Sequence, residues 1–384
     1  MKRTCKKPLL VLIICLVIFS AMEIPSGFFR TKLFLLLAPD DSLVMHFSIY
    51  PEGYTTFCAD GVSPILLDVS LFDSNQNPIP FSSIHVRLNN SSVRMKPSHP
   101  ITDKDGRAII TLFPEELNQF GEDGEDFHSE ISVCLELNAY KATPVRWEGR
   151  MATPPVVLIH GFQDTSEAMV PLHNYLLDKG FQVYSLDYAT DTDLETMSDA
   201  LDKFLASTTL DLKEKGIHAG RMDLVAHSLG GIVARFYTSQ TTYLQKQNVH
   251  KLIFINVPHF GTPWAEAGAA LLNTPFLTEL YPTSELYTSV FPNFINRGLN
   301  QNIQTANIAL ENDEVVPLPS STLSSWGIDT KVYRIGSEPL SLESVISNQV
   351  TGVSRHRQLL FYTPVFEEIF DYLTNSLPYP QKKK

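Results

Sequence analysis

The hydrophobic pattern of the chain changes near residue 150, and this change limits the folds available to it. After a proline-rich joint at 150–155, short apolar runs such as "VVLIH" alternate with long helical stretches such as "LETMSDALDKFLASTTLDLKEKG". Strands that are apolar on both sides need cover on both faces. Residues 152–377 are therefore predicted to form an α/β domain with a doubly wound, mostly parallel sheet.

Residues 44–148 have a different pattern, in which apolar and polar side chains alternate. It is clearest in "SPILLDVSLFD", "SSIHVRLNN", "RAIITLF" and "SEISVCLELNAY". Turn-forming residues separate these runs, including Asp105-Gly106 and the acidic loop at 121–126. Several short strands without a strong helical stretch predict a separate all-β sandwich.

The amino terminus has the pattern of an export signal. Four basic residues precede an uncharged apolar run from Pro8 to Met22. As a helix this run would be about 22 Å long, which is shorter than the hydrocarbon core of about 30 Å. Residues 1–26 are therefore predicted to be a signal peptide, and the protein to be exported. The sequence lacks a good cleavage site, so a membrane anchor at the cell envelope stays open.

Cys58 and Cys134 are the two cysteines that follow the leader. Because exported proteins meet an oxidising environment, a disulfide between them is slightly favoured. Two buried free thiols are the alternative, and sequence spacing does not decide between them.

The net charge of −12 argues against a nucleic-acid partner, since phosphate binding needs a basic face. It leaves open an apolar contact with a membrane surface or micelle. The chemistry predicted below needs no cofactor, and the sequence does not decide whether calcium is bound.

Ser228 lies in "VAHSLGG", between a predicted strand at 222–227 and a predicted helix. A serine on such a strand–turn–helix can be a nucleophile. The close approach of strand and helix requires small residues two positions before and after it, and Ala226 and Gly230 meet this requirement. A serine that only caps the helix is the alternative.

A nucleophilic serine needs a histidine base, and three histidines follow it. His250 begins a predicted strand and so lies at the opposite edge of the sheet from Ser228. His259 precedes any suitable acid, whereas the usual order after a nucleophile elbow is serine, acid, histidine. His356 lies between a strand and the helix "TPVFEEIFDYL", and is the predicted base.

Asp313 is the predicted orienting acid, because it follows a strand that ends near Leu310. Glu311 and Glu314 in the same loop are the alternatives. Asp329 begins the next strand and therefore lies at the opposite edge.

The mechanism also needs donors for an oxyanion. The backbone N–H groups of Leu229 and Phe162 are predicted to serve. Leu229 opens a helix, whose amino terminus favours negative charge. Phe162 follows Gly161, where the backbone can turn inward.

The motifs "VVLIHGF", "VAHSLGG", "NVPHFGTPWAEA", "ENDEVVP" and "SRH" resemble, in this order, the lipase branch of the α/β-hydrolases. The resemblance covers about residues 152–377 and implies serine-ester chemistry through an acyl-enzyme. It also implies that His160, His227 and His259, which match motif positions, orient loops or pack beside the serine.

The segments "ADGVSPILLDVSLFDSNQNPIPFSSIHVRL" and "ITDKDGRAIITL" resemble bacterial immunoglobulin-like domains of the invasin and intimin type. The resemblance covers about a quarter of the chain and carries no catalytic residues. It implies an exported spacer or adhesive module, and the spacer is preferred.

The segment at 263–296 is rich in Leu, Phe, Tyr and Trp, with only Glu266, Glu279 and Glu285 charged. It follows the end of a predicted strand, where a lid or an acyl-chain groove would insert. Ordinary helices packed on the sheet are an equal alternative.

These features together predict an exported serine hydrolase of lipid or other carboxylic esters, either a triacylglycerol lipase or a carboxylesterase. A lipid acyltransferase is one alternative. The other is a surface adhesion or binding protein with an inactive hydrolase domain.

Overall fold

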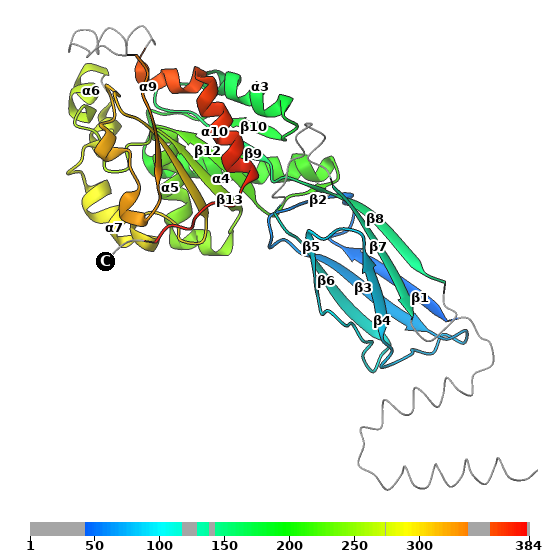
Figure 1. The fold of residues 1–384 in the computed structure, drawn as a ribbon. Coiled ribbons are helices and arrows are strands. Elements are labelled where there is room, and N and C mark those ends of the chain that lie inside the picture. The colour runs from blue at the N-terminus through cyan, green and yellow to red at the C-terminus, as the bar shows by residue number, and fades with distance from the viewer. Residues whose placement is uncertain (1–42, 117–128, 138–142, 273, 337–353, 382–384) are drawn as a thin grey trace, which may run out of the picture.

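The computed structural model describes residues 43–116, 129–137, 143–272, 274–336 and 354–381, which form a β-sandwich followed by an α/β unit (Figure 1). The predicted leader and the acidic loop at 121–126 lie outside these residues. Within the described ranges, no helix has both the length and the apolar character needed to cross a membrane.

The β-sandwich contains two sheets. The first has four antiparallel strands, in the order β1 (Val44–Tyr50), β3 (Ile65–Phe72), β6 (Arg107–Pro114) and β5 (Val93–Lys96). The second has the order β11 (Ile217–His218), β2 (Thr56–Cys58), β8 (Val145–Ala152), β7 (Ser129–Leu137) and β4 (Ile84–Leu88). The predicted alternation is clearest in β3, where every second residue from Ile65 to Leu71 is fully buried.

The two parts of the chain are more closely joined than the sequence predicts. Strand β8 runs to Ala152, so that only Thr153–Pro155 separate it from β9 (Val156–Ile159). Strand β11 comes from the α/β half of the chain, yet it pairs in parallel with β2 at the edge of the sandwich. The sandwich sheet is thus completed by a later segment.

The disulfide favoured from the sequence is wrong, because Cys58 and Cys134 are free thiols. Cys58 lies in β2 and Cys134 in β7, and β8 runs between these strands. Two strand spacings amount to about 10 Å, whereas a disulfide needs Cα atoms within about 7 Å.

The α/β unit has a six-stranded parallel sheet, and the predicted doubly wound α/β-hydrolase fold is confirmed. Its order is β10 (Val183–Leu186), β9, β12 (Met222–His227), β13 (Val249–Ile255), β14 (Gln304–Leu310) and β15 (Thr330–Tyr333). Its long helices are α3 (Val170–Asp178), α4 (Leu194–Glu214), α5 (Leu229–Ser239) and α10 (Thr363–Thr374), and the short ones are α6 (Ala265–Leu272), α7 (Phe291–Asn293) and α9 (Arg355–Gln358).

Both faces of this sheet are buried, as the continuous apolar runs predict. Leu224 and Ala226 of β12 pack in the cluster that contains residues of α4 and α5. Val225, between them, faces the other way and packs with residues of α3 and α10. The helices thus cover both faces and leave the strand ends for loops (Figure 1).

The segment at 263–296 contributes mainly to packing. Its buried apolar side chains join the core cluster that contains residues of α5, and they are Ala265, Phe276, Leu277, Leu280, Leu286 and Phe291. This favours ordinary packing over a lid for these residues. Trp264, at the start of the segment, is 39% exposed.

Candidate active site

Ser228 occupies a sharp turn between β12 and α5, as predicted. Its backbone has φ of 50° and ψ of −122°, a conformation that costs free energy for any residue with a side chain. Its N–H donates to the carbonyl of Ile255 at 3.0 Å, at the end of the neighbouring strand β13. The strain places the serine hydroxyl above the carboxyl edge of the sheet.

The small residues beside the serine have the steric role predicted for them. A Cβ atom on Gly230 would lie 2.5 Å from the carbonyl oxygen of His160 and 2.8 Å from the side chain of Ile159. Ala226 is fully buried between the neighbouring strands. A methyl group is therefore tolerated before the serine, whereas none fits two residues after it.

His356 links Ser228 to Asp313 through two hydrogen bonds. Its Nε2 atom lies 2.8 Å from the Ser228 hydroxyl oxygen, and its Nδ1 atom lies 2.7 Å from Oδ2 of Asp313. A carboxylate accepts only, so Nδ1 carries the proton and Nε2 accepts from the hydroxyl. The structure thus brings together the three residues that the sequence singled out.

Asp313 is held in the loop after β14 by backbone donors. Its Oδ1 atom accepts from the N–H groups of Val315 at 2.5 Å and Val316 at 2.7 Å, and its side chain is fully buried. The two alternative acids are engaged elsewhere. Glu311 pairs with Arg334 at the surface, and Glu314 accepts from the backbone N–H of Arg355 at 2.6 Å.

The electrostatic environment of His356 favours its charged form. Burial lowers the pKa of this imidazole, but the charge and hydrogen bond of Asp313, with smaller contributions from Glu314 and Asp164, outweigh burial and leave the pKa raised. The neighbouring His227 differs, because burial and the charge of His356 hold its pKa well below the usual value. Only one of these two buried histidines is therefore suited to take a proton.

Asn256 is a site residue that the sequence reasoning missed. It follows β13 with φ of 52°, and its amide nitrogen donates to Oδ2 of Asp313 and lies 3.0 Å from Nδ1 of His356. Its Oδ1 atom accepts from the N–H of Leu310 at 3.1 Å, which fixes the orientation of the amide. The available signal was its position directly after a strand at the carboxyl edge of the sheet.

The two predicted oxyanion donors belong to the residue after Ser228 and to a loop that packs against Ser228. Leu229 is the first residue of α5, so its N–H has no acceptor within the helix. The loop that carries Phe162 packs against Ser228, since a Cβ atom on Gly161 would lie 3.1 Å from Cβ of Ser228. This loop is also tied to α9 by an ion pair of 2.7 Å between Asp164 and Arg357.

The other histidines of the motifs have structural contacts. The ring of His160 stacks on Tyr188, with centroids 4.5 Å apart, and Nε2 of His227 bonds the carbonyl of His356 at 3.2 Å. His259 lies between the buried Arg235 and Asn307. In the described parts of the chain, no group of three or more His, Cys, Asp or Glu side chains is arranged to hold a metal ion.

Residues 155–304 match the family model of palmitoyl protein thioesterase. The match covers less than half of the chain. It includes Ser228 and Asn256, and it ends before Asp313 and His356.

Three of the solved structures that match this chain have low sequence identity to it. A lipase from Bacillus licheniformis is 18% identical, with 56% of this chain and 91% of that chain covered and a TM-score of 0.38. Aspergillus fumigatus lipase B is 17% identical over 59% of this chain and 54% of that chain, with a TM-score of 0.43. The D00-D0 domain of intimin is 13% identical over 30% of this chain and 50% of that chain, with a TM-score of 0.24. Residues 155–304 are thus similar to palmitoyl protein thioesterases, and the assignment of the α/β fold rests on the chain's own sheet.

Proposed function

We propose that this protein is a serine hydrolase that cleaves lipid carboxylic esters through an acyl-serine intermediate. The observation that carries the proposal is the continuous hydrogen-bond chain from the Ser228 hydroxyl through His356 to Asp313. The strained turn at Ser228 supports it further, because strain of this kind clusters at functional sites.

Each residue of the chain then has a defined role. His356 accepts the hydroxyl proton as Oγ of Ser228 attacks the acyl carbon, and Asp313 stabilises the imidazolium that forms. The N–H groups of Leu229 and Phe162 stabilise the oxyanion. His356 returns the proton to the leaving alcohol, and then activates the water that releases the acid from the serine.

Asn256 acts as a positioning residue in this scheme. Its amide donates to the same carboxylate oxygen that faces His356. It therefore limits rotation of the Asp313 carboxylate and keeps this oxygen directed at the imidazole.

A thioester is the second candidate substrate. The family model that matches residues 155–304 is described as palmitoyl protein thioesterase. The same nucleophilic attack releases a thiol in place of an alcohol, so the triad serves either bond. Comparing p-nitrophenyl palmitate with a palmitoyl thioester of the same acyl chain separates the two candidates.

The central test is Ser228→Ala, with Ser239→Ala as a matched control. Ser239 is buried in α5, and its hydroxyl has no partner among the described residues. Loss of the nucleophile should lower turnover of p-nitrophenyl esters by on the order of 10⁶, whereas the control should keep wild-type turnover. Wild-type turnover in Ser228→Ala would contradict the proposal.

Two further measurements separate the alternatives. A fluorophosphonate probe should label the wild type and spare Ser228→Ala, and a folded wild type that is not labelled would favour a binding protein. Product analysis with an added alcohol acceptor distinguishes an acyltransferase from a hydrolase. A series of acyl chain lengths, with and without micelles, separates a lipase from an esterase.

We also propose that the protein is exported and that the β-sandwich is an immunoglobulin-like module of bacterial type. Its motifs and the basic, then apolar, amino terminus support this. Fractionation of cells that express the full chain, and a variant without residues 1–26, tests export: only the full chain should leave the cytoplasm.

A further inference from the structure

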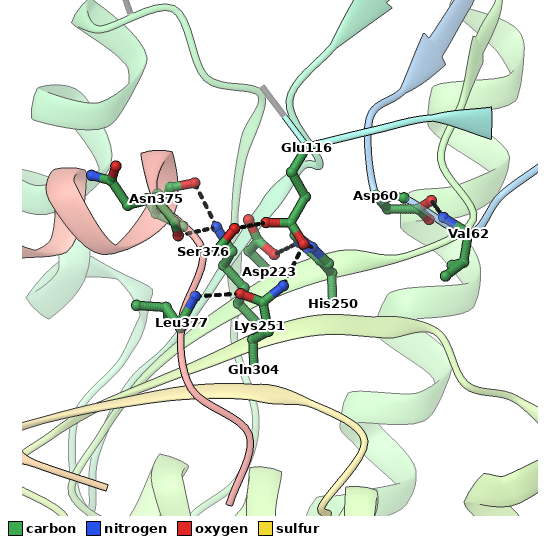
Figure 2. Close-up of polar contacts among 12 residues, drawn as sticks. Asp60, Val62, Glu116, Asp223, His250, Lys251, Gln304, Asn375, Ser376 and Leu377 are labelled. Atoms are coloured by element: carbon green, nitrogen blue, oxygen red, sulfur yellow. Dashed lines mark hydrogen bonds and ion pairs between the residues drawn. The ribbon is translucent and has the colours of Figure 1, made fainter. Parts of the chain in front are cut away.

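Figure 2 shows a polar cluster around the starts of strands of the parallel sheet, whereas the candidate active site lies at the strand ends. We call it the basal cluster, and its members come from the sandwich, three strands and the carboxyl-terminal tail. They are Glu116, Asp223, His250, Lys251, Gln304 and Ser376. Asp223, His250 and Gln304 lie at the starts of β12, β13 and β14, whereas Ser228 and Asp313 follow strand ends.

His250 is held between two carboxylates. Its Nδ1 atom lies 2.7 Å from Oδ1 of Asp223, and its Nε2 atom lies 3.2 Å from Oε1 of Glu116. The imidazole is only 3% exposed and Asp223 is fully buried. An ionised carboxylate can only accept hydrogen bonds, so both ring nitrogens must carry protons for both contacts to be favourable. The geometry therefore requires an imidazolium.

We propose that Glu116 holds the β-sandwich on the α/β half by pairing with a doubly protonated His250, so that the two halves unfold as one unit. Glu116 follows β6 of the sandwich, and His250 lies in β13 of the α/β sheet. The carboxylate thus supplies, from the other half of the molecule, a counter-charge for a buried cation.

Glu116 also binds two other segments of the α/β half. Gln304 donates its amide N–H to Oε1, and Ser376 donates its hydroxyl to Oε2 at 2.9 Å. Gln304 in turn accepts from the backbone N–H of Leu377 at 2.5 Å (Figure 2). One carboxylate therefore joins the sandwich to the central strands and to the tail after α10.

The other charged groups near His250 form hydrogen bonds elsewhere and do not compete for Glu116. Lys251 directs its ammonium at backbone carbonyls at the carboxyl-terminal end of α10. Asp60 accepts from the N–H groups of Val62 and Ser63 within its own loop. Burial raises the pKa of the Cys58 thiol, which therefore stays uncharged. Two carboxylates, Glu116 and Asp223, then balance the imidazolium and the ammonium.

The charges set a pH range for this contact. Burial lowers the pKa of His250, but Asp223 and Glu116 outweigh burial and raise it to about 9. Burial raises the pKa of Glu116, but the contacts with His250 and the charge of Lys251 lower it to about 2. Because the folded-state pKa of His250 is raised, its contribution is complete below about pH 6.5 and is lost as the pH rises through about 9.

Direct packing between the halves accompanies the basal cluster. The N–H of Thr55 in the sandwich donates to the carbonyl of Gly216 at 2.9 Å, beside the pairing of β11 with β2. A Cβ atom on Gly220 would lie 1.9 Å from the Ser63 hydroxyl. The two halves are therefore in direct contact at these positions as well.

The test compares Glu116→Gln with Glu115→Gln in the full chain. Glutamine keeps the shape of Glu116 but removes its charge, so His250 loses one counter-charge. The neighbouring Glu115 pairs with Arg94 inside the sandwich at 2.8 Å and is about half exposed, so its change is a matched control. Cleavage of the native protein at Thr153–Pro155 by a nonspecific protease reports separation of the halves.

We expect cleavage of Glu116→Gln to be at least about tenfold faster than that of Glu115→Gln, with two calorimetric transitions in place of one. Equal rates and a single transition in both variants would overturn the proposal. Cleavage of the wild type should accelerate between pH 8 and pH 10 by a similar factor, and a flat profile there would also count against it.

A spectroscopic measurement covers the case in which Glu116→Gln fails to fold. Nitrogen-15 resonances of histidine-labelled wild type, assigned with His250→Gln, should show both ring nitrogens of His250 protonated at pH 7.5. A neutral imidazole at that pH would overturn the proposal. None of these readouts depends on whether Ser228 is a nucleophile.

Discussion

The Nδ1 atom of His356 lies 2.7 Å from Oδ2 of Asp313, and both side chains are buried although they are 43 residues apart. Asp313 follows strand β14, and His356 lies in the first turn of α9. The contact selects the tautomer that leaves Nε2 free to accept from Ser228.

The pH dependence of hydrolysis should have an acid limb above the usual histidine range. His356 must be neutral to accept the proton from Ser228, and its pKa is raised by Asp313 against the opposing effect of burial. We therefore expect kcat/KM to rise with pH through a midpoint above about 6.5. A profile of kcat/KM between pH 5 and pH 9 with a p-nitrophenyl ester measures it, and a midpoint below 6 would contradict the assignment of His356.

Replacing Asp313 with asparagine should remove most of the activity without unfolding the protein. The amide cannot stabilise the imidazolium, and it presents an N–H group to Nδ1 that favours the wrong tautomer. We expect kcat to fall about 10⁴-fold, and the remaining acid limb to move to lower pH. Glu311→Gln, which changes a surface partner of Arg334 in the same loop, is the control and should keep wild-type kcat. A loss below tenfold in Asp313→Asn would point to another orienting acid, such as Glu314.

Asn256→Ala tests the positioning role of this amide. A hydrogen bond to a charged group contributes about 1.5–3 kcal/mol, so kcat should fall roughly 10- to 100-fold, with KM nearly unchanged. The acid limb should also move to higher pH, because Asp313 loses a donor that shares its charge. Asn312→Ala is the control, since Asn312 donates to the carbonyl of Ile335, away from His356. Equal kinetics and pH profiles in the two variants would mean that Asn256 has only a structural role.

Ser228 and Asp313 could be predicted because each follows the end of a buried strand, and such ends can be located from the hydrophobic period. His356 could be predicted from its place after that acid and before the last helix. Asn256 could not, since its role depends on where its amide points between β13 and β14. Glu116 and His250 are 134 residues apart and belong to different halves, so the sequence does not predict that they meet. The error on Cys58 and Cys134 has a related cause: spacing along the chain does not give the order of strands in a sheet.

Gly230→Ala should destabilise the α/β half. The added methyl carbon would lie 2.5 Å from the backbone carbonyl oxygen of His160, which cannot move without shifting the end of β9. We expect a loss of about 1–3 kcal/mol in the free energy of unfolding. Activity should also fall, because Ser228 and Phe162 are each two residues from this contact along the chain.

Gly268→Ala in α6 is the matched control for this prediction. Its nearest contact would be 3.3 Å from the end of the flexible Leu277 side chain, and alanine favours a helix over glycine by about 0.5–1 kcal/mol. Chemical denaturation should show no loss of stability. Equal stability of the two variants would contradict the steric role of Gly230.

Lys251→Met tests two effects of this buried lysine, which are its hydrogen bonds to the end of α10 and its charge beside His250. Its ammonium donates to the carbonyls of Tyr372, Leu373 and Asn375 at 2.8–3.2 Å, at the carboxyl-terminal end of α10. Removing it leaves these carbonyls without their donor and should lower the free energy of unfolding by about 3 kcal/mol. Lys246→Met, which breaks a surface ion pair with Asp202, should cost less than about 1 kcal/mol.

Lys251→Met should also favour the protonated form of the neighbouring His250. The ammonium of Lys251 opposes protonation of His250, so its loss should raise the pKa of His250 above about 9. The pH at which protease cleavage between the halves accelerates should therefore increase, although the protein as a whole is less stable. A shift of that midpoint to lower pH would show that the alkaline transition comes from general loss of stability, and that His250 does not control it.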